Sequence, residues 1–208
     1  MKLRERLLFV VAGLLVSLPA FAHHGMGGAT PRTFGQGFLS CLVHPVIGLD
    51  HVLFLLTAGV LAYSLKTPMK YVMPLLFVVS TLAGTVLHLA GLASFGVECV
   101  VALSLILGVG LVLWRRSLGP LAAGLFFGCA GGLHGYAYAA PVLDAEISPV
   151  SAYLSGVALI QAAFLLGIVA CLGKLDTPAR QGRGGISEQL AGGVAVVAGM
   201  VFLTLAIV

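Results

Sequence analysis

Six apolar segments, each long enough to cross a lipid bilayer as a helix, constrain the fold of this chain more than any other feature. They cover approximately residues 38–65, 71–93, 97–114, 118–140, 149–173 and 187–207. A transmembrane helix needs about 20 predominantly apolar residues. Only 9% of the residues are charged, whereas soluble domains carry about 25%. We therefore expect an all-α integral membrane protein, built as a bundle of six transmembrane helices.

The first 22 residues have the three parts of a signal peptide. MKLRER is a basic start, LLFVVAGLLVSL is an apolar run, and Ala20-Phe21-Ala22 fits the small-x-small cleavage pattern. The apolar run is short and ends at Pro19, which favours cleavage over an uncleaved first transmembrane helix. We expect residues 1–22 to be removed and residues 23–208 to form a single transmembrane domain of six helices.

The basic residues predict how the chain is oriented. If cleavage leaves the new N-terminus outside, the inner loops hold Lys66, Lys70, Arg115, Arg116, Lys174, Arg180 and Arg183. The outer side then holds only Arg32. Loops on the cytoplasmic side of membrane proteins carry this excess of Lys and Arg. We expect a multi-pass protein of the bacterial inner membrane with both mature termini on the periplasmic side. Because the cations form no basic run, they give no indication of nucleic-acid binding.

Histidine and acidic side chains within the spans share one depth. With this orientation the outer half of the bundle holds His44, Asp50, His51, His88, Glu98 and His134. An ionised Asp at a helix centre costs about 2.5–3.5 kcal/mol on insertion scales. Such groups usually face the bundle interior and mark a site or a pathway. The shared depth predicts one site, to which Tyr138, one turn after His134, and Glu146 in the next outer loop are additional candidates.

The segment HPVIGLDH, residues 44–51, leaves two geometries open. On an intact helix His44 and His51 share a face but lie ~10 Å apart along the axis, too far to bind one ion easily. Pro45 suits the first turn of a helix, which would place His44 at or just before a helix start. Either the first span is broken near Pro45–Gly48, or the two histidines occupy successive positions on a path. Asp50 would be a ligand or a partner that orients a histidine ring.

Two stripes of residues predict how neighbouring helices meet. Thr81, Thr85 and His88 fall at positions i, i+4 and i+7, which predicts one polar face turned into the bundle. The fourth span carries glycines at four-residue spacing, at Gly124, Gly128 and Gly132. Such a stripe favours the close approach of a neighbouring helix backbone.

The residue types at the predicted site indicate a divalent transition-metal ion. Neutral imidazole combined with carboxylate suits the borderline ions of Ni, Co, Zn, Cu and Fe. The four cysteines stand singly without a CxxC pair, which disfavours a thiolate site. The chain has neither a Walker A motif nor an HExxH motif. An inside-negative potential is worth about 2.3 kcal/mol per charge per 100 mV, which favours inward movement of a divalent cation without ATP.

The same residues carry a family resemblance. HPVIGLDH is a His-x5-Asp-His motif in the first mature span, and LHGYAY follows at residues 133–138. Together they resemble the HupE/UreJ family of nickel/cobalt permeases, which are hydrogenase and urease accessory membrane proteins. The resemblance covers nearly the whole mature chain. It implies an uptake permease for nickel and/or cobalt, without enzymatic activity or a permanent cofactor, in which His44, Asp50, His51 and His134 handle the metal.

The second motif departs from the usual form of the family, Phe-His-Gly-x-Ala-His-Gly-x-Glu. Leu133 replaces the Phe, Tyr138 stands where the second His is common, and Pro141 stands where the Glu is common. Glu146, a few residues later, would supply a carboxylate instead. The departures bear on which metal moves and how tightly it binds.

Cleavage after Ala22 would create a second metal-binding group at the new N-terminus. The free α-amine would be followed directly by His23 and His24. All three nitrogens are largely deprotonated at about pH 7–8, so they could chelate an ion before it reaches His44. The alternative is that His23 and His24 are only a spacer.

Two other functions use the same residue types. Four histidines on transmembrane helices could bind a b-type haem in an electron-transfer subunit. A zinc-activated water would need similar ligands in an intramembrane hydrolase. We favour transport, with a divalent ion and the lipid bilayer as partners, and the sequence leaves homo-oligomerisation open.

Overall fold

The computed structural model describes residues 29–47, 49–92, 96–113 and 118–175, and every regular element in these ranges is helical. The elements are α2 (Phe34–Ile47), α3 (Leu49–Tyr63), α4 (Met69–Leu89), α5 (Val97–Leu113), α6 (Pro120–Tyr138), the short 3₁₀ helix η1 (Ala140–Val142) and α7 (Ile147–Leu175). The predicted signal peptide, the pair His23 and His24, and the sixth predicted span at 187–207 lie outside these residues.

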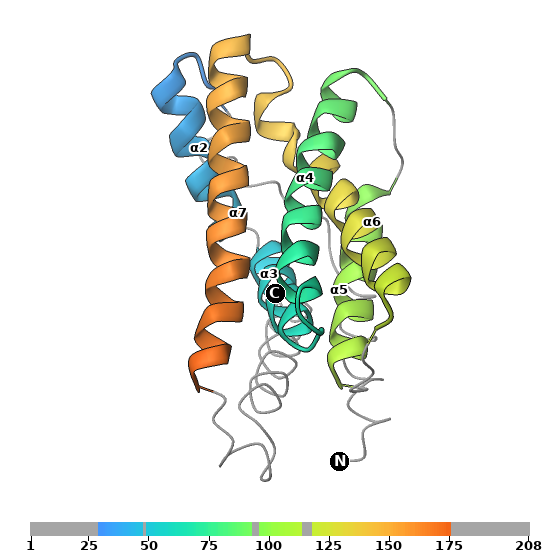
Figure 1. Cartoon of the computed structure of the whole chain (residues 1–208). Coiled ribbons are helices and arrows are strands. Elements are labelled where there is room, and N and C mark those ends of the chain that lie inside the picture. Colours follow the sequence, from blue (N-terminus) through green and yellow to red (C-terminus); the bar gives the residue numbers. More distant parts are fainter. Residues whose placement is uncertain (1–28, 48, 93–95, 114–117, 176–208) are drawn as a thin grey trace, which may run out of the picture.

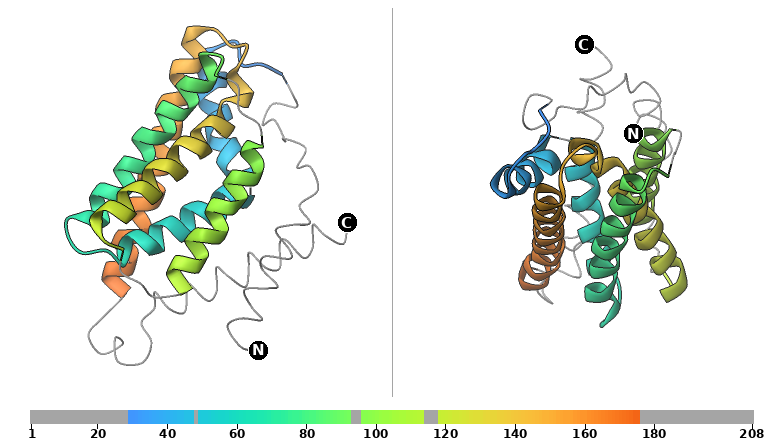
Figure 2. Two further views of the ribbon diagram at one scale, coloured as in Figure 1. Left: turned by 90° about the vertical axis from the view of Figure 1, so that its right-hand side faces the viewer. Right: turned by 90° about the horizontal axis from the view of Figure 1, so that it is seen from above.

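The long helices pack side by side in one elongated bundle (Figures 1 and 2). Helices α4 and α6 run parallel, because Phe77 meets Gly131 and Thr81 meets Gly135 at successive turns. Helix α7 runs parallel to α2 and α3, since Gly37 approaches Pro149 and Gly59 approaches Ile168, and it runs antiparallel to α4 (Figure 1). The alternating direction predicted for the first five spans is therefore present in the bundle.

The first predicted span is two helices rather than one. Helix α2 continues through His44 and Pro45 to Ile47, and α3 begins at Leu49. The expectation that His44 sits at or just before a helix start is therefore wrong, because His44 lies inside the last turn of α2. A proline inside a helix removes the hydrogen bond to the residue four before it, and α2 ends two residues after Pro45. The span is broken in the segment that contains HPVIGLDH.

The glycines that bring α4 and α6 together differ from the predicted stripe. A Cβ atom at Gly131 or Gly135 would overlap the backbone of Phe77 or Thr81, and one at Gly84 would overlap the backbone carbonyl of Gly132. A Cβ at Gly124 would meet nothing within 4 Å. The stripe expected at 124, 128 and 132 is therefore only partly in the contact: Gly132 meets Gly84, whereas the closest approaches of α6 to α4 also involve Gly131 and Gly135.

A glycine also ends α4. Gly91 has a φ of +83°, which favours glycine because a Cβ is strained there. Its N–H donates to the carbonyl of His88, and the N–H of Leu92 donates to the carbonyl of Leu87. This is the Schellman arrangement that closes many helices.

The apolar core has two main parts. The larger, which we call the Phe54 cluster, is centred on Phe54, Phe77, Leu105, Phe127 and Leu165. The smaller, which we call the Tyr153 cluster, contains Cys41, Val142, Tyr153 and Val157. Some of the buried polar side chains lie where the helices pass from one cluster to the other, and Ser104 joins them through its contact with His134. We call these the polar layer, and its members are His51, Thr81, Thr85, Ser104, His134, Tyr138 and Gln161.

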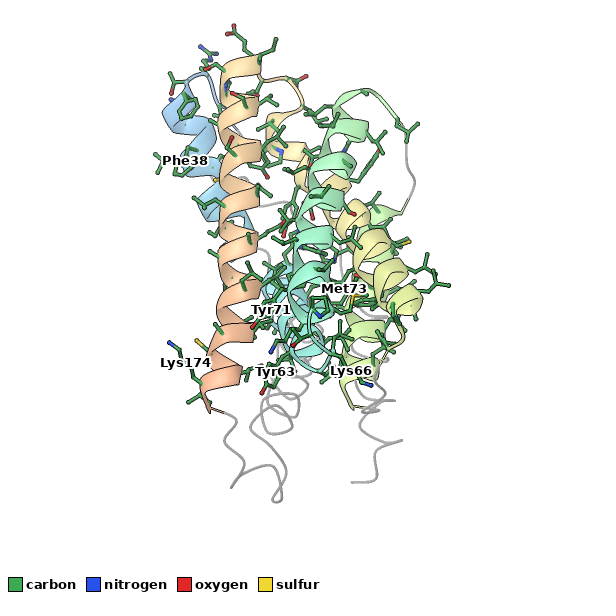
Figure 3. All side chains as sticks on the ribbon, in the orientation of Figure 1. Phe38, Tyr63, Lys66, Tyr71, Met73 and Lys174 are labelled. Atoms are coloured by element: carbon green, nitrogen blue, oxygen red, sulfur yellow. The ribbon has the colours of Figure 1, made fainter. Side chains whose placement is uncertain are left out.

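The outward surface of the helices is apolar. Leu121 is 77% exposed, and Val79 and Leu159 are exposed to a similar degree. By length and composition, α4 and α7 are able to cross a bilayer, and the shorter stretches His51–Tyr63 and Cys99–Val112 are also apolar. Lys66 and Lys174 lie at the same end of the bundle (Figure 3). Exposed Asp144 and Glu146 lie in the turn between η1 and α7.

Candidate functional site

Two buried histidines meet in the polar layer. His51 comes from the first turn of α3 and is 8% exposed, whereas His134 comes from the last turns of α6 and is 1% exposed. Their ring centroids lie 5.2 Å apart, with the ring planes tilted by 55°. The structure therefore brings together two predicted site residues that are 83 positions apart in the sequence.

Tyr138 lies beside this pair, one turn after His134. Its buried ring meets the ring of His51 edge-on, with the centroids 4.5 Å apart. The hydroxyl of Tyr153 in α7 donates to the backbone carbonyl of Tyr138 at 2.8 Å, which ties the end of α6 to α7. The prediction that His134 and Tyr138 share one face is confirmed, because both contact His51.

Two aromatic rings of the Phe54 cluster pack near His134. The centroid of the Phe54 ring lies 4.1 Å from that of His134, and the centroid of Phe77 lies 5.9 Å from it. In such an apolar surrounding, electrostatic interactions and hydrogen bonds are stronger than in water. A cation between the two imidazoles would therefore interact with them with little screening.

Ser104 in α5 determines which nitrogen of His134 carries the proton in the neutral ring. The serine hydroxyl donates its single hydrogen to the carbonyl of Val101 at 2.6 Å. It also lies 3.0 Å from Nε2 of His134, where it can therefore only accept a hydrogen bond. Nε2 then carries the hydrogen and Nδ1 carries the lone pair, which is the form that can bind a metal ion.

The predicted polar stripe of α4 is buried at both threonines, but their hydroxyls bond to the backbone. Thr81 donates to the carbonyl of Phe77. The Thr85 hydroxyl shares its single hydrogen between the carbonyl of Thr81 at 3.0 Å and that of Gly135 in α6 at 2.8 Å. The Thr85 hydroxyl thus links α4 to α6, whereas the Thr81 hydroxyl bonds within α4.

His88 is placed differently from the other two histidines. Its ring stacks on Tyr136 with the centroids 3.8 Å apart and the planes nearly parallel. Its Nδ1 lies 2.7 Å from the backbone carbonyl of Tyr136, so Nδ1 carries a hydrogen. The described contacts of His88 thus lead to Tyr136 and not to His51 or His134. Its membership of the same site stays a prediction.

For the remaining candidate residues, the structure gives either the position in a helix or the exposure of the side chain. His44 lies near the end of α2, Asp50 is the second residue of α3, and Glu98 is the second residue of α5. Glu146 is exposed in the turn before α7. Among the side chains that the structure describes, no group of three His, Cys, Asp or Glu residues could hold a metal ion. The metal roles of all these residues stay predictions.

Sequence reasoning missed two members of the polar layer. Ser104 is the only hydroxyl residue within α5, and Gln161 is the only amide within α7. The site residues predicted from the sequence all have ionisable side chains, and neither serine nor glutamine is ionisable. Any hydrogen-bonding side chain inside an apolar span is a signal of the same kind, because polar groups in lipid need partners.

The comparisons with known proteins agree with the resemblance seen in the motifs. The family model described as HupE / UreJ protein matches residues 10–202. Protein HupE of Rhizobium leguminosarum bv. viciae is 28% identical over 192 residues, which cover 90% of this chain and 93% of that protein. No solved structure matches the chain significantly.

Proposed function

Because the chain belongs to the HupE/UreJ family, we propose that it is an inner-membrane permease that takes up a divalent transition-metal ion, nickel and/or cobalt. The observation that carries the proposal is the meeting of His51 and His134, from two helices, in the buried polar layer. Imidazole nitrogen is a suitable ligand for both ions. The metal is the cargo, so the proposal needs neither a permanent cofactor nor a catalytic step.

The histidine pair is suited to hold an ion only briefly. With Nδ1 of His134 carrying the lone pair, the ring can bind a cation while Ser104 keeps it in place. Asp50 precedes His51 directly in α3, and His44 lies just before the break between α2 and α3. These two residues would add ligands at the entry to the pair. Conduction requires sites that attract an ion but also release it.

The distribution of charge supports inward movement driven by the membrane potential. Lys66 and Lys174 lie together at one end of the bundle (Figure 3), and this end would face the cytoplasm by the positive-inside rule. The acidic residues Asp144 and Glu146 would then face the periplasm, where they would raise the local concentration of cations. The predicted six spans and periplasmic termini belong to the same proposal.

The haem alternative has less support from the geometry. A bis-histidine haem needs the macrocycle between two imidazoles. The rings of His51 and His134 instead lie 5.2 Å apart, and the rings of Phe54 and Tyr138 pack against them. The hydrolase alternative needs three protein ligands and a bound water, and no described observation favours it.

Uptake into proteoliposomes tests the proposal. The purified full chain is reconstituted into vesicles that contain a metal-sensitive dye, and an inside-negative potential is set with potassium and valinomycin. We expect Ni²⁺ or Co²⁺ entry that rises with the potential and needs no ATP. His51→Ala should abolish this entry.

The control is Leu125→Ala, which changes an exposed apolar side chain on α6 and should leave uptake unchanged. Equal uptake by the wild type and His51→Ala would contradict the proposal, as would vesicles that admit neither metal. A Soret band in the purified protein would favour haem instead.

A further inference from the structure

Gln161 is a buried amide that the motifs do not explain. It lies in the middle of α7, and none of its surface is exposed. Among the residues that the structure describes, neither Oε1 nor Nε2 of Gln161 has a hydrogen-bond partner. A buried polar group without partners destabilises a fold, so each one calls for an explanation.

The position of Gln161 on α7 places it in the polar layer. Val157, one turn earlier on the same buried stripe, belongs to the Tyr153 cluster. Leu165, one turn later, belongs to the Phe54 cluster. Gln161 therefore lies where α7 passes from one apolar cluster to the other.

Helix α6 passes between the clusters in the same way. Ala130 belongs to the Phe54 cluster and Val142 to the Tyr153 cluster. His134 and Tyr138 lie between these two residues along the chain. His134, Tyr138 and the amide of Gln161 therefore occupy corresponding levels of the bundle.

The contacts of α7 with α2 and α3 place Gln161 at the same level of the bundle. Gly156 meets Cys41 in α2, and Ile168 meets Gly59 in α3. On α7, Gln161 lies between Gly156 and Ile168. On the first span, the break between α2 and α3 lies between their contact residues Cys41 and Gly59. The amide is thus level with the segment that carries HPVIGLDH.

We propose that Gln161 supplies its amide oxygen to the divalent ion as the ion passes the histidine pair, and so acts as a specificity-determining ligand of the path. This inference rests on the proposed transport function. An amide oxygen is a neutral donor, so it helps to replace the water around the cation without adding a charge that would trap it. A set of nitrogen and oxygen ligands suits borderline ions and disfavours soft ones such as Cu(I).

Three variants test the proposal by uptake, metal affinity and thermal stability of the full chain. Gln161→Leu removes both polar atoms at similar volume. We expect Ni²⁺ uptake to fall by at least about tenfold, the scale of losing a partner of a metal site. The melting temperature should stay the same or rise, because the substitution removes a buried amide that has no hydrogen-bond partner among the described residues. Gln161→Glu keeps an oxygen in place and should bind Ni²⁺ more tightly, with uptake restored above that of the leucine variant.

Gln36→Leu is the matched control, because the half-buried Gln36 accepts a hydrogen bond from the backbone of Arg32 outside the polar layer. Its uptake should equal that of the wild type. If Gln161→Leu transports and binds Ni²⁺ as the wild type does, the inference is wrong while the proposed function stands. If the melting temperature of Gln161→Leu falls and Gln161→Glu restores stability but not uptake, the amide is structural and the inference is also wrong. Absence of Ni²⁺ and Co²⁺ uptake by the wild type would instead overturn the proposed function.

Discussion

Two pairs of histidine and tyrosine meet at the end of α6, which carries both tyrosines, yet the pairs serve different purposes. His51 meets Tyr138 edge-on inside the polar layer, with the ring of His134 beside them. His88 instead stacks flat on Tyr136 and is half-buried. Both tyrosines come from the last turn of α6 and point to different neighbours.

The pair of His88 and Tyr136 helps to fix the C-terminal end of α4. The carbonyl of His88 accepts the N–H of Gly91 in the Schellman turn. The hydroxyl of Tyr136 donates to the carbonyl of Leu92 just beyond this turn. With Nδ1 of His88 on the carbonyl of Tyr136, the pair joins the end of α4 to the end of α6. A structural role accounts for all these contacts.

The comparison shows that a histidine in an apolar span is not sufficient to identify a metal ligand. What distinguishes the two sites is how the ring nitrogens are held. In the polar layer, a hydroxyl fixes the tautomer of His134 and a second imidazole lies at 5.2 Å. At the end of α4, the ring nitrogen bonds directly to the backbone.

The largest expected difference between the two sites is in transport. His134→Ala should reduce Ni²⁺ uptake by at least about 100-fold, because losing a ligand exceeds the 10–100-fold effect of losing a partner behind it. His88→Ala should retain most of the uptake. Initial rates in proteoliposomes, normalised to reconstituted protein, measure both. Equal losses of uptake in His134→Ala and His88→Ala would mean that the two histidines do not differ in function.

Both sites depend on the close approach of α4 and α6, so a bulky side chain between these helices should disrupt both. Gly84→Val places a branched side chain against the backbone of Gly132, and overpacking of this kind costs about 1–3 kcal/mol or more. We expect a lower melting temperature in detergent and a smaller yield of folded protein. Gly124→Ala, where a Cβ meets nothing within 4 Å, is the control and should be neutral or slightly stabilising. A Gly84→Val variant as stable as the wild type would show that the contact is looser than described.

Loss of the hydroxyl that fixes the tautomer of His134 should have an intermediate effect. Ser104→Ala removes the acceptor for Nε2–H and should weaken Ni²⁺ binding by roughly 10–100-fold. Titration calorimetry on purified protein measures the change in affinity. Ser155→Ala changes an exposed hydroxyl that donates to the carbonyl of Ser151 on α7 and should leave affinity unchanged. If both serine variants bind equally well, Ser104 does not orient the ring.

The smallest expected effect is at the end of α4. His88→Phe keeps the stacking on Tyr136 but loses the hydrogen bond to its carbonyl. One hydrogen bond contributes about 0.5–1.5 kcal/mol to stability, so we expect a slightly lower melting temperature and near-normal uptake. A loss of uptake without a loss of stability would place His88 in the transport site after all.

Much of the fold follows from local patterns in the sequence. The apolar segments predict α4 to α7 to within a few residues, because helix length is set by the run of apolar residues between breaks. The helical period also predicts that His134 and Tyr138 share a face. The break after Pro45 was one of two alternatives, since a proline is tolerated at a helix start and also weakens a helix interior.

The remainder depends on contacts between segments that are distant in the chain. Gly131 and Gly135 join Gly132 in the contact with α4, whereas Gly124 does not, because the neighbours of α6 set its rotation about its axis. The difference between His88 and His134 depends on Tyr136 and Ser104, which lie on other helices. Gln161 stands out only when its burial and the absence of partners among the described residues are known together.

The central claim is that His51 and His134 bind the same ion, and a double-mutant cycle of Ni²⁺ affinity tests it most directly. The wild type, His51→Ala, His134→Ala and the double variant are purified in detergent and titrated calorimetrically, after circular dichroism has shown equal helix content. If the residues share one ion, the double variant should bind nearly as well as the weaker single variant, because removing one ligand already dismantles the site. Losses of binding free energy that simply add would mean that the two histidines act at separate sites, and would contradict the account.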